Sequence, residues 1–311
     1  MSRNYKDMLY ELGYSNIMEN AKEYRTRPIY RESDNNTVLR ISKQNGYFVD
    51  FAKNISGSFE DLVKLSLDLK SIEDVKGWVS KHGGVSSTSE EAKPTIRAQK
   101  TFPKAVLAKL FPDHSYWVAR GVSEYTVSRF RGGIVREGKM ANRYVFPIFD
   151  AKENLVGVAG RDLISSDRRP KWKLIGDKSQ WKYPAFLNHR ELKESKSVII
   201  VESIGDMLAL WDCEIKNVCV TFGLDIGPAL LNLFLRYDME RVIVSFNDDS
   251  ENNEAGNLAA NKAEKKLLRY FDRSQISVAL PTRNDFGEMS KDEIIKWVKQ
   301  HNIYQPQESR R

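Results

Sequence analysis

The part of the chain after residue 196 alternates short apolar runs with helical periods, and this alternation constrains the fold more than any other feature. Apolar runs at 197–201, 218–221, 241–246 and 276–280 predict strands, and the segments 204–212, 226–236 and 254–272 predict the helices between them. Near-continuous apolar strands are typical of a parallel sheet that is buried on both faces. We therefore expect an α/β fold, a doubly wound and mainly parallel sheet with right-handed crossovers.

Polar side chains that can bind a cation follow these strands where they end. They are Glu202, Asp206, Asn247, Asp248, Asp249 and Asp285. The carboxyl ends of parallel strands meet at one edge of a sheet, where ligands bind. Clustered carboxylates repel one another unless a cation offsets their charge, and Mg²⁺ is the usual choice where phosphates react. Any one of these residues alone is as well explained as a helix cap, but acidic residues at successive strand ends favour phosphoryl-transfer chemistry.

Three segments resemble the motifs of the TOPRIM domain. They are VIIVESIGDMLAL at 198–210, VIVSFNDDSENNEAGNLAA at 242–260, and RNDFGEM at 283–289, which is similar to the acidic third motif of primases. The resemblance implies a TOPRIM domain over 196–290 with Mg²⁺ or Mn²⁺ as cofactor. It implies Glu202, Asp206 and Asp249 as catalytic residues, and a metal bound by Glu202, Asn247, Asp248, Asp249 and Asp285. Asn247 departs from the pattern, because it stands where the first Asp of the Asp-x-Asp motif is expected.

The region before this domain, 102–195, resembles the basic primase-core subdomain. The similar stretches are RGVSEYTVSRF at 120–130, RYVFPIFDAKENLVGVAGRDL at 143–163 and PKWKLI at 170–175. The expected nucleotide- and template-binding residues are Arg161, Lys171, Trp172, Lys173, Lys178 and Lys182. Lysine and arginine neutralise phosphates, and Trp172 and Trp181 are candidates to stack on bases. The alternative is a solvated charged loop whose tryptophans pack in the core.

The first 83 residues resemble the primase zinc-binding module in layout only. Runs at 37–41 and 47–51 flank Asn45-Gly46 and predict a hairpin, and a helix over 58–69 is expected to begin at the N-cap Ser58. The zinc ligands are absent, because Arg27, Arg31, Val49 and Ala52 stand where ligands are expected. The chain has two cysteines, Cys213 and Cys219, without a CxxC pair, so no zinc is expected. Residues 84–101 predict a flexible linker, and 291–311 a terminal helix and tail.

Taken together, the resemblance implies a DNA primase of the phage or bacterial type. Such an enzyme makes short RNA primers on single-stranded DNA from NTPs during DNA replication. A net charge of +7 suits a polyanionic partner. Since no GxxxxGK[ST] motif occurs, we expect the replicative helicase to be a separate chain. With no apolar run of the length that spans a membrane and no signal-peptide core, we expect no membrane partner and a place in the cytoplasm, that of the host if a phage encodes the chain.

Two alternatives remain open at this point. Asn247 and the missing zinc ligands favour a primase relative that has lost catalysis and acts as a nucleic-acid-binding accessory. A TOPRIM nuclease shares the carboxylates but does not need the primase-core stretches. A topoisomerase is least favoured, because no segment stands out as a catalytic tyrosine domain.

Overall fold

A computed structural model describes residues 5–53, 55–82, 100–164, 169–248 and 255–303, without the side chains of 255–257. Asp249 and nearly all of the predicted linker 84–101 lie outside these ranges. Two units are distinguished, and each is described by itself. The first consists of Met1–Ile96 with Glu264–Ile276, and the second of Arg97–Ala263 with Ser277–Arg311.

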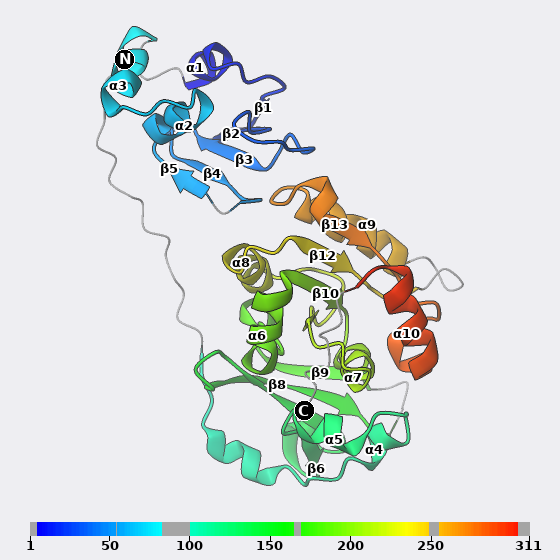
Figure 1. Ribbon diagram of the computed structural model, residues 1–311. Coiled ribbons are helices and arrows are strands. Elements are labelled where there is room, and N and C mark those ends of the chain that lie inside the picture. Colours follow the sequence, from blue (N-terminus) through cyan, green and yellow to red (C-terminus); the bar gives the residue numbers. More distant parts are fainter. Residues whose placement is uncertain (1–4, 54, 83–99, 165–168, 249–254, 304–311) are drawn as a thin grey trace, which may run out of the picture. The chain divides into compact units, whose positions relative to one another are not determined.

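The first unit contains an antiparallel sheet of order β1-β2-β3-β4-β5 and three helices, α1 to α3 (Figure 1). The strands are β1 (Met18–Glu19), β2 (Glu23–Thr26), β3 (Leu39–Ser42), β4 (Phe48–Asp50) and β5 (Ile55–Gly57). The helices are α1 (Tyr5–Glu11), α2 (Phe59–Ser66) and α3 (Ile72–Lys81).

Both local predictions in this unit are confirmed. Strands β3 and β4 form the hairpin, and Gly46 in its turn has a φ of 71°, which favours glycine. A Cβ atom at Gly46 would lie 2.5 Å from the ring of Tyr5, so the turn also needs glycine for space. Ser58 caps α2 through a reciprocal pair of hydrogen bonds with Asp61.

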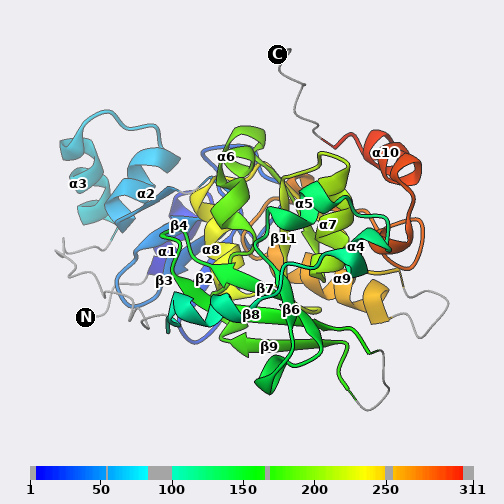
Figure 2. The same ribbon diagram turned by 90° about the horizontal axis from the view of Figure 1, so that it is seen from below.

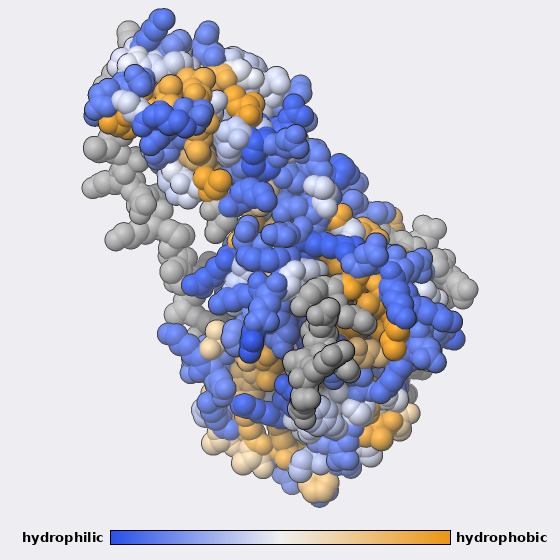
Figure 3. Space-filling view, viewed as in Figure 1, coloured by the Kyte–Doolittle hydropathy of each residue, from blue (hydrophilic) through white to orange (hydrophobic). Residues whose placement is uncertain are grey.

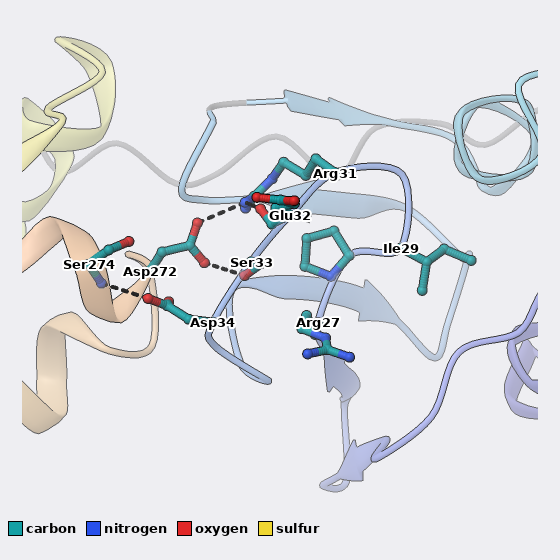
Figure 4. A pocket seen from close by; sticks show the side chains of 9 residues that line it. Arg27, Ile29, Arg31, Glu32, Ser33, Asp34, Asp272 and Ser274 are labelled. Atoms are coloured by element: carbon teal, nitrogen blue, oxygen red, sulfur yellow. Dashed lines mark hydrogen bonds and ion pairs between the residues drawn. The ribbon is translucent and has the colours of Figure 1, made fainter.

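A buried ion-pair cluster holds the loop after β2 in the first unit (Figure 4). Figure 4 shows the guanidinium of Arg31 in contact with the carboxylate of Asp272, at an N–O distance of 2.7 Å. The guanidinium also contacts the carboxylate of Asp50, at 2.7 Å. Asp50 is fully buried and also accepts a hydrogen bond from the hydroxyl of Tyr30. The hydroxyl of Ser33, which lies in the same loop as Arg31, donates a hydrogen bond to the carboxylate of Asp272. Arg31 stands where the resemblance places a zinc ligand. In this structure its guanidinium forms ion pairs with two carboxylates instead.

The second unit begins with an antiparallel sheet of order β6-β7-β8-β9. Its strands are β6 (Gly133–Val135), β7 (Arg143–Phe149), β8 (Leu155–Asp162) and β9 (Trp172–Gly176). Short helices flank it, namely η1 (Lys104–Lys109), α4 (Ser115–Val118), α5 (Glu124–Ser128), η2 (Gly138–Met140) and η3 (Lys178–Gln180). Ser123 caps α5, and its hydroxyl accepts a hydrogen bond from the backbone N–H of Thr126. Strand β9 lies at the edge of this sheet, so this part of the basic stretch is a strand and not the charged loop of the alternative.

The second sheet of this unit has the order β11-β10-β12-β13. Its strands are β10 (Ser197–Val201), β11 (Val218–Val220), β12 (Arg241–Val244) and β13 (Ile276–Val278). The helices are α6 (Ala185–Ser195), α7 (Ile204–Asp212), α8 (Pro228–Arg236), α9 (Ala255–Leu267) and α10 (Lys291–Gln300), with the short turn η5 (Phe286–Glu288). The end of α9 and the turn η4 (Arg273–Gln275) belong to the first unit. Strand β10 is parallel to both β11 and β12. This confirms the expected parallel α/β fold.

One hydrophobic cluster joins the two sheets of the second unit. It includes Trp117 and Phe146 on the side of the antiparallel sheet, and Ile199 and Leu208 on the side of the parallel sheet. Figure 2 shows α4, α5 and α7 lying next to one another, in agreement with the contacts between them. Because these elements share one core, the strand ends and the basic subdomain keep fixed positions relative to each other.

Trp181 belongs to this core, so the idea that it stacks on bases is wrong. Its side chain is 2% exposed and packs edge-on against Phe222. A Cβ atom at Gly157 would lie 2.2 Å from its ring, so the neighbouring strand needs glycine to make room for the indole. This outcome matches the alternative in which a tryptophan of the basic stretch fills the core.

Hydrophilic side chains cover most of the face shown in Figure 3. No helix in the described ranges is long and apolar enough to cross a membrane.

Candidate active site

Hydrogen bonds tie together the segments that follow three strands of the parallel sheet. The backbone N–H of Asn247, after β12, donates to the Glu202 carboxylate after β10, at 3.1 Å. The N–H of Asp248 donates to the carbonyl of Asn284, at 2.9 Å. The segments that carry Glu202, Asp248 and Asp285 therefore meet at one edge, as the strand pattern indicates.

Asp206 holds the third of these segments in place from the first turn of α7. Its Oδ2 accepts hydrogen bonds from the backbone and hydroxyl of Ser203, at 3.1 and 2.7 Å. Its Oδ1 accepts one from the backbone N–H of Phe286, at 3.2 Å. With both oxygens engaged and the residue 2% exposed, Asp206 is placed to position the loop that carries Asp285.

The carboxylates influence one another electrostatically. Burial, together with the negative charges of Asp285 and Glu202, raises the pKa of Asp206 to about 7. Glu202 and Asp285 are themselves partly exposed. A shared cation would relieve this repulsion, and a donor set made of carboxylate oxygens fits a hard divalent ion.

The described residues do not yet form a ligand cage. Within the described ranges, no group of three or more His, Cys, Asp or Glu side chains is arranged to hold a metal ion. Asp249, the predicted ligand next to Asp248, lies outside those ranges. The charge and the donor chemistry fit a divalent ion, while the ligand roles predicted for Glu202, Asn247, Asp248, Asp249 and Asp285 stay predictions.

Arg161 and Trp172, two of the predicted nucleotide-binding residues, are paired across adjacent strands. They are cross-strand partners on β8 and β9, and the Arg161 guanidinium lies over the indole, 5.7 Å from its centroid. Trp172 in turn stacks at 6.3 Å on Trp117. Trp117 packs against the start of α7. A Cβ atom built at Gly205, in the first turn of that helix, would lie 3.6 Å from the Trp117 ring. The pair is thus linked to the turn that follows Glu202.

No local sequence pattern marks Tyr116, whose hydroxyl holds Arg161. The Tyr116 hydroxyl accepts a hydrogen bond from Arg161 Nε, at 2.9 Å. Arg120 covers the ring of Tyr116 from 4.8 Å. The two partners are 45 residues apart, and no local pattern connects them.

The four predicted lysines occupy different places. Lys178 lies beside the acidic edge, since its Nζ donates to the carbonyl of Phe222, and the N–H of the next residue, Gly223, donates to the Glu202 carbonyl. Lys173 on β9 donates to the carbonyl of Lys139. The remaining two, Lys171 and Lys182, are exposed. Lys182 lines a cleft between α6 and α8, away from β9.

Comparison with known proteins gives consistent matches. Residues 199–290 match the family model described as Toprim-like. A DNA primase of Borreliella burgdorferi is 31% identical over 182 residues, which are 56% of this chain and 32% of that protein. A DNA primase of Helicobacter pylori is 30% identical over 135 residues, 42% of this chain and 23% of that protein. The matches thus span a third or less of the length of these relatives.

Solved structures show the same fold at low identity. The zinc-binding and RNA polymerase domains of Aquifex aeolicus primase align with a TM-score of 0.53 and 17% identity, over 94% of this chain and 83% of that one. A primase catalytic domain bound to single-stranded DNA aligns with a TM-score of 0.50 and 19% identity, over 64% of this chain and 73% of that one.

The parallel sheet with its acidic edge therefore defines a TOPRIM domain, in agreement with the family match over residues 199–290. The antiparallel sheet that precedes it and the curated relatives narrow the class further. The chain is a relative of the bacterial-type DNA primases, and the resemblance expected from its motifs is confirmed.

Proposed function

We propose that this chain is a DNA primase that makes short RNA primers on single-stranded DNA during DNA replication. The observation that carries the proposal is the hydrogen-bonded meeting of the Glu202, Asn247 and Asp285 segments beside the Arg161–Trp172 pair. The relatives named above, all DNA primases, support the same activity. Since they match over only part of their length, activity, substrates and partners are proposed here for the chain itself.

The chemistry is nucleotidyl transfer. The 3′-hydroxyl of the growing strand attacks the α-phosphorus of an NTP, a new P–O bond forms, and pyrophosphate leaves with the electrons of the broken bond. In this scheme Glu202 accepts the hydroxyl proton or binds the metal. Asp206 keeps the Asp285 loop against this edge. Mg²⁺ or Mn²⁺, when bound by Glu202, Asn247, Asp248, Asp249 and Asp285, supplies Lewis-acid stabilisation of phosphate charge.

The basic residues bind the substrates in this scheme. Arg161, Lys171 and Lys173 contact NTP and template phosphates, with Trp172 beneath a base. Lys178 provides positive charge beside Glu202, and Lys182 extends the surface toward α6. A solved primase catalytic domain is bound to single-stranded DNA, which supports the choice of template. A replicative helicase is the proposed partner, and the activity belongs in the cytoplasm, where replication takes place.

Primer synthesis with labelled NTPs, Mg²⁺ and single-stranded DNA tests the proposal. Wild type should make short RNA, Glu202→Gln should make none, and Glu214→Gln, which alters an exposed side chain, should behave as wild type. If no RNA forms even with a replicative helicase present, the primase proposal is wrong. DNA cleavage without nucleotides would then point to a TOPRIM nuclease.

Asn247 favours one second candidate, an accessory protein that binds nucleic acid without catalysis. An amide oxygen in place of a carboxylate weakens one metal position. For an accessory, single-stranded DNA binding should be tight and unchanged in Glu202→Gln, and no variant except Asn247→Asp should produce RNA.

A further inference from the structure

The cleft between α6 and α8 is a second basic feature of the second unit. Figure 1 and Figure 2 both show these helices side by side. The cleft has a volume of about 710 Å³ and is also lined by the turn between β7 and β8. Its polar lining includes Lys182, His189 and Lys193 on one wall, and Asn232 and Arg236 on the other.

Several side chains line each wall of the cleft. Phe186, His189 and Lys193 come from α6, on either side of Asn188, whose non-helical backbone interrupts the helix. Lys182 lines the same wall from the segment just before α6. Asn232 and Arg236 are four residues apart on α8. Each wall therefore presents a row of polar groups to the same cleft rather than a single charge.

The three cations of the cleft, Lys182, Lys193 and Arg236, outnumber its two acidic residues, and both acidic residues have other partners. Asp150 accepts hydrogen bonds from its own turn, at 2.8 Å each from the backbone N–H groups of Lys152 and Asn154. Glu153 pairs with Arg131, at 3.3 Å.

The cleft's own cations lack such partners. Within the described ranges, no ion pair involves Lys182, Lys193 or Arg236. All three are exposed. A polyanion is the ligand that this charge fits.

Aromatic rings accompany these charges. Phe186 packs edge-on against Phe149 on the floor of the cleft, with centroids 5.3 Å apart. The Lys193 ammonium lies 5.2 Å from the ring centroid of Tyr237. Phe186 and Tyr237 are both partly exposed. Cations interleaved with aromatic rings are typical of surfaces that bind single-stranded nucleic acid, because phosphates meet the cations and bases stack on the rings.

One end of the cleft lies toward the acidic edge. Helices α6 and α8 precede β10 and β12 and run antiparallel to them, so their first turns lie toward the carboxyl ends of the strands. Lys178, just before α6, contacts the loop that is bonded to Glu202. Lys193 and Arg236 lie near the other ends of their helices. The 11 residues of α6, with the helix interrupted at Asn188, lie between Lys178 and the far end of this wall.

We propose that single-stranded DNA leaves the acidic edge along the cleft between α6 and α8, where Lys182, Lys193 and Arg236 bind its phosphates. This proposal rests on the proposed function only in identifying the bound polyanion as single-stranded DNA. It adds a binding path that lies outside the residues of nucleotidyl transfer.

The test is binding of fluorescent oligo-dT by anisotropy, without NTPs or divalent metal, over a range of salt concentrations. The double variant Lys193→Gln with Arg236→Gln removes two charges from the cleft. The control double variant Lys296→Gln with Lys299→Gln removes two charges from the exposed side of α10. Unchanged melting temperatures establish that both variants fold.

We expect the cleft variant to bind a long oligonucleotide about tenfold more weakly, with a salt slope that is about 1.4 smaller, since each contact with a single strand contributes about 0.7. The control should match wild type at every salt concentration. Equal losses in the cleft and control variants would overturn the proposal. Because no nucleotide is present, an inactive polymerase would not affect this result.

Discussion

The Oδ1 atom of Asp206 accepts a hydrogen bond from the backbone N–H of Phe286, 80 residues further along the chain. This bond joins the helix after β10 to the loop that carries Asp285. Since the remaining oxygen of Asp206 is bonded to Ser203, the carboxyl fixes two of the three acidic segments relative to each other. Asp206 is thus better placed to order the site than to meet a substrate.

The first prediction concerns the pH dependence of stability without divalent metal. Asp206 has a pKa of about 7 in the folded protein and 3.8 as its ordinary value. Between these values the unfolded chain releases a proton that the folded chain retains, so the wild type loses stability as the pH rises through this window. Above about pH 7 the loss is complete. Asp206→Asn cannot titrate, so its melting temperature relative to wild type should rise from pH 4 to pH 7 and then level off.

Thermal melts in EDTA at closely spaced pH values measure this difference. Asp292→Asn, which alters an exposed residue of α10, is the matched control and should follow the wild-type profile. A difference between Asp206→Asn and wild type that is constant from pH 4 to pH 8 would contradict the raised pKa.

The second prediction concerns the ion-pair cluster of the first unit. Arg31→Met leaves the buried carboxylate of Asp50 without its cation, and an uncompensated buried charge costs about 3–5 kcal/mol. Urea unfolding should show this loss for the first unit, and Asp50→Asn added to Arg31→Met should recover part of it. Arg27→Met, which alters an exposed arginine of the same loop, is the control. If the two arginine variants lose the same stability, the ion pairs contribute nothing specific.

The third prediction separates the role of Tyr116 from its packing. Tyr116→Phe keeps the ring and removes the acceptor for Arg161 Nε. A hydrogen bond is worth about 1 kcal/mol net, so KM for NTP should rise about fivefold while kcat and the melting temperature change little. The control is Tyr125→Phe, whose hydroxyl accepts from Arg129, a residue outside the predicted site. A loss of kcat in Tyr116→Phe without a change in KM would argue against a binding role for Arg161.

The sequence predicted those parts of the site that depend on local order. Glu202 and Asn247 follow apolar runs that form neighbouring strands, and parallel pairing alone brings such residues to one edge. The cap Ser58 was likewise evident from the residues that follow it. These features are encoded within about ten residues, where periodicity and capping act.

Features that depend on distant contacts were not predictable in this way. Trp181 sits in a basic stretch, yet glycines on neighbouring strands leave room for its indole in the core. Strand β9 is only partly buried, so its residues lack the apolar pattern that marks β10. The bond between Tyr116 and Arg161 exists because α4 packs beside β8, and no composition signal accompanies it.

The fourth prediction uses Asn247, the position at which the chain departs from the TOPRIM motif. Its backbone N–H binds Glu202, so the residue already lies at the acidic edge. Asn247→Asp adds a carboxylate there, and this extra negative charge should lower the melting temperature in EDTA through repulsion. With Mg²⁺ present the same charge should strengthen metal binding about tenfold, the order of effect seen when groups around a metal change.

Titration of Mg²⁺ against both melting temperature and primer synthesis measures this effect, with the exposed Asn302→Asp as control. The variant should be less stable than wild type without metal, and it should reach half-maximal activity at a lower Mg²⁺ concentration. If the wild type makes no primers and Asn247→Asp does, the accessory-protein candidate is favoured instead, because the amide of Asn247 would then be what prevents catalysis. A variant with the wild-type Mg²⁺ dependence would place residue 247 outside the metal site and leave the ligand role to Asp248, Asp249 and Asp285.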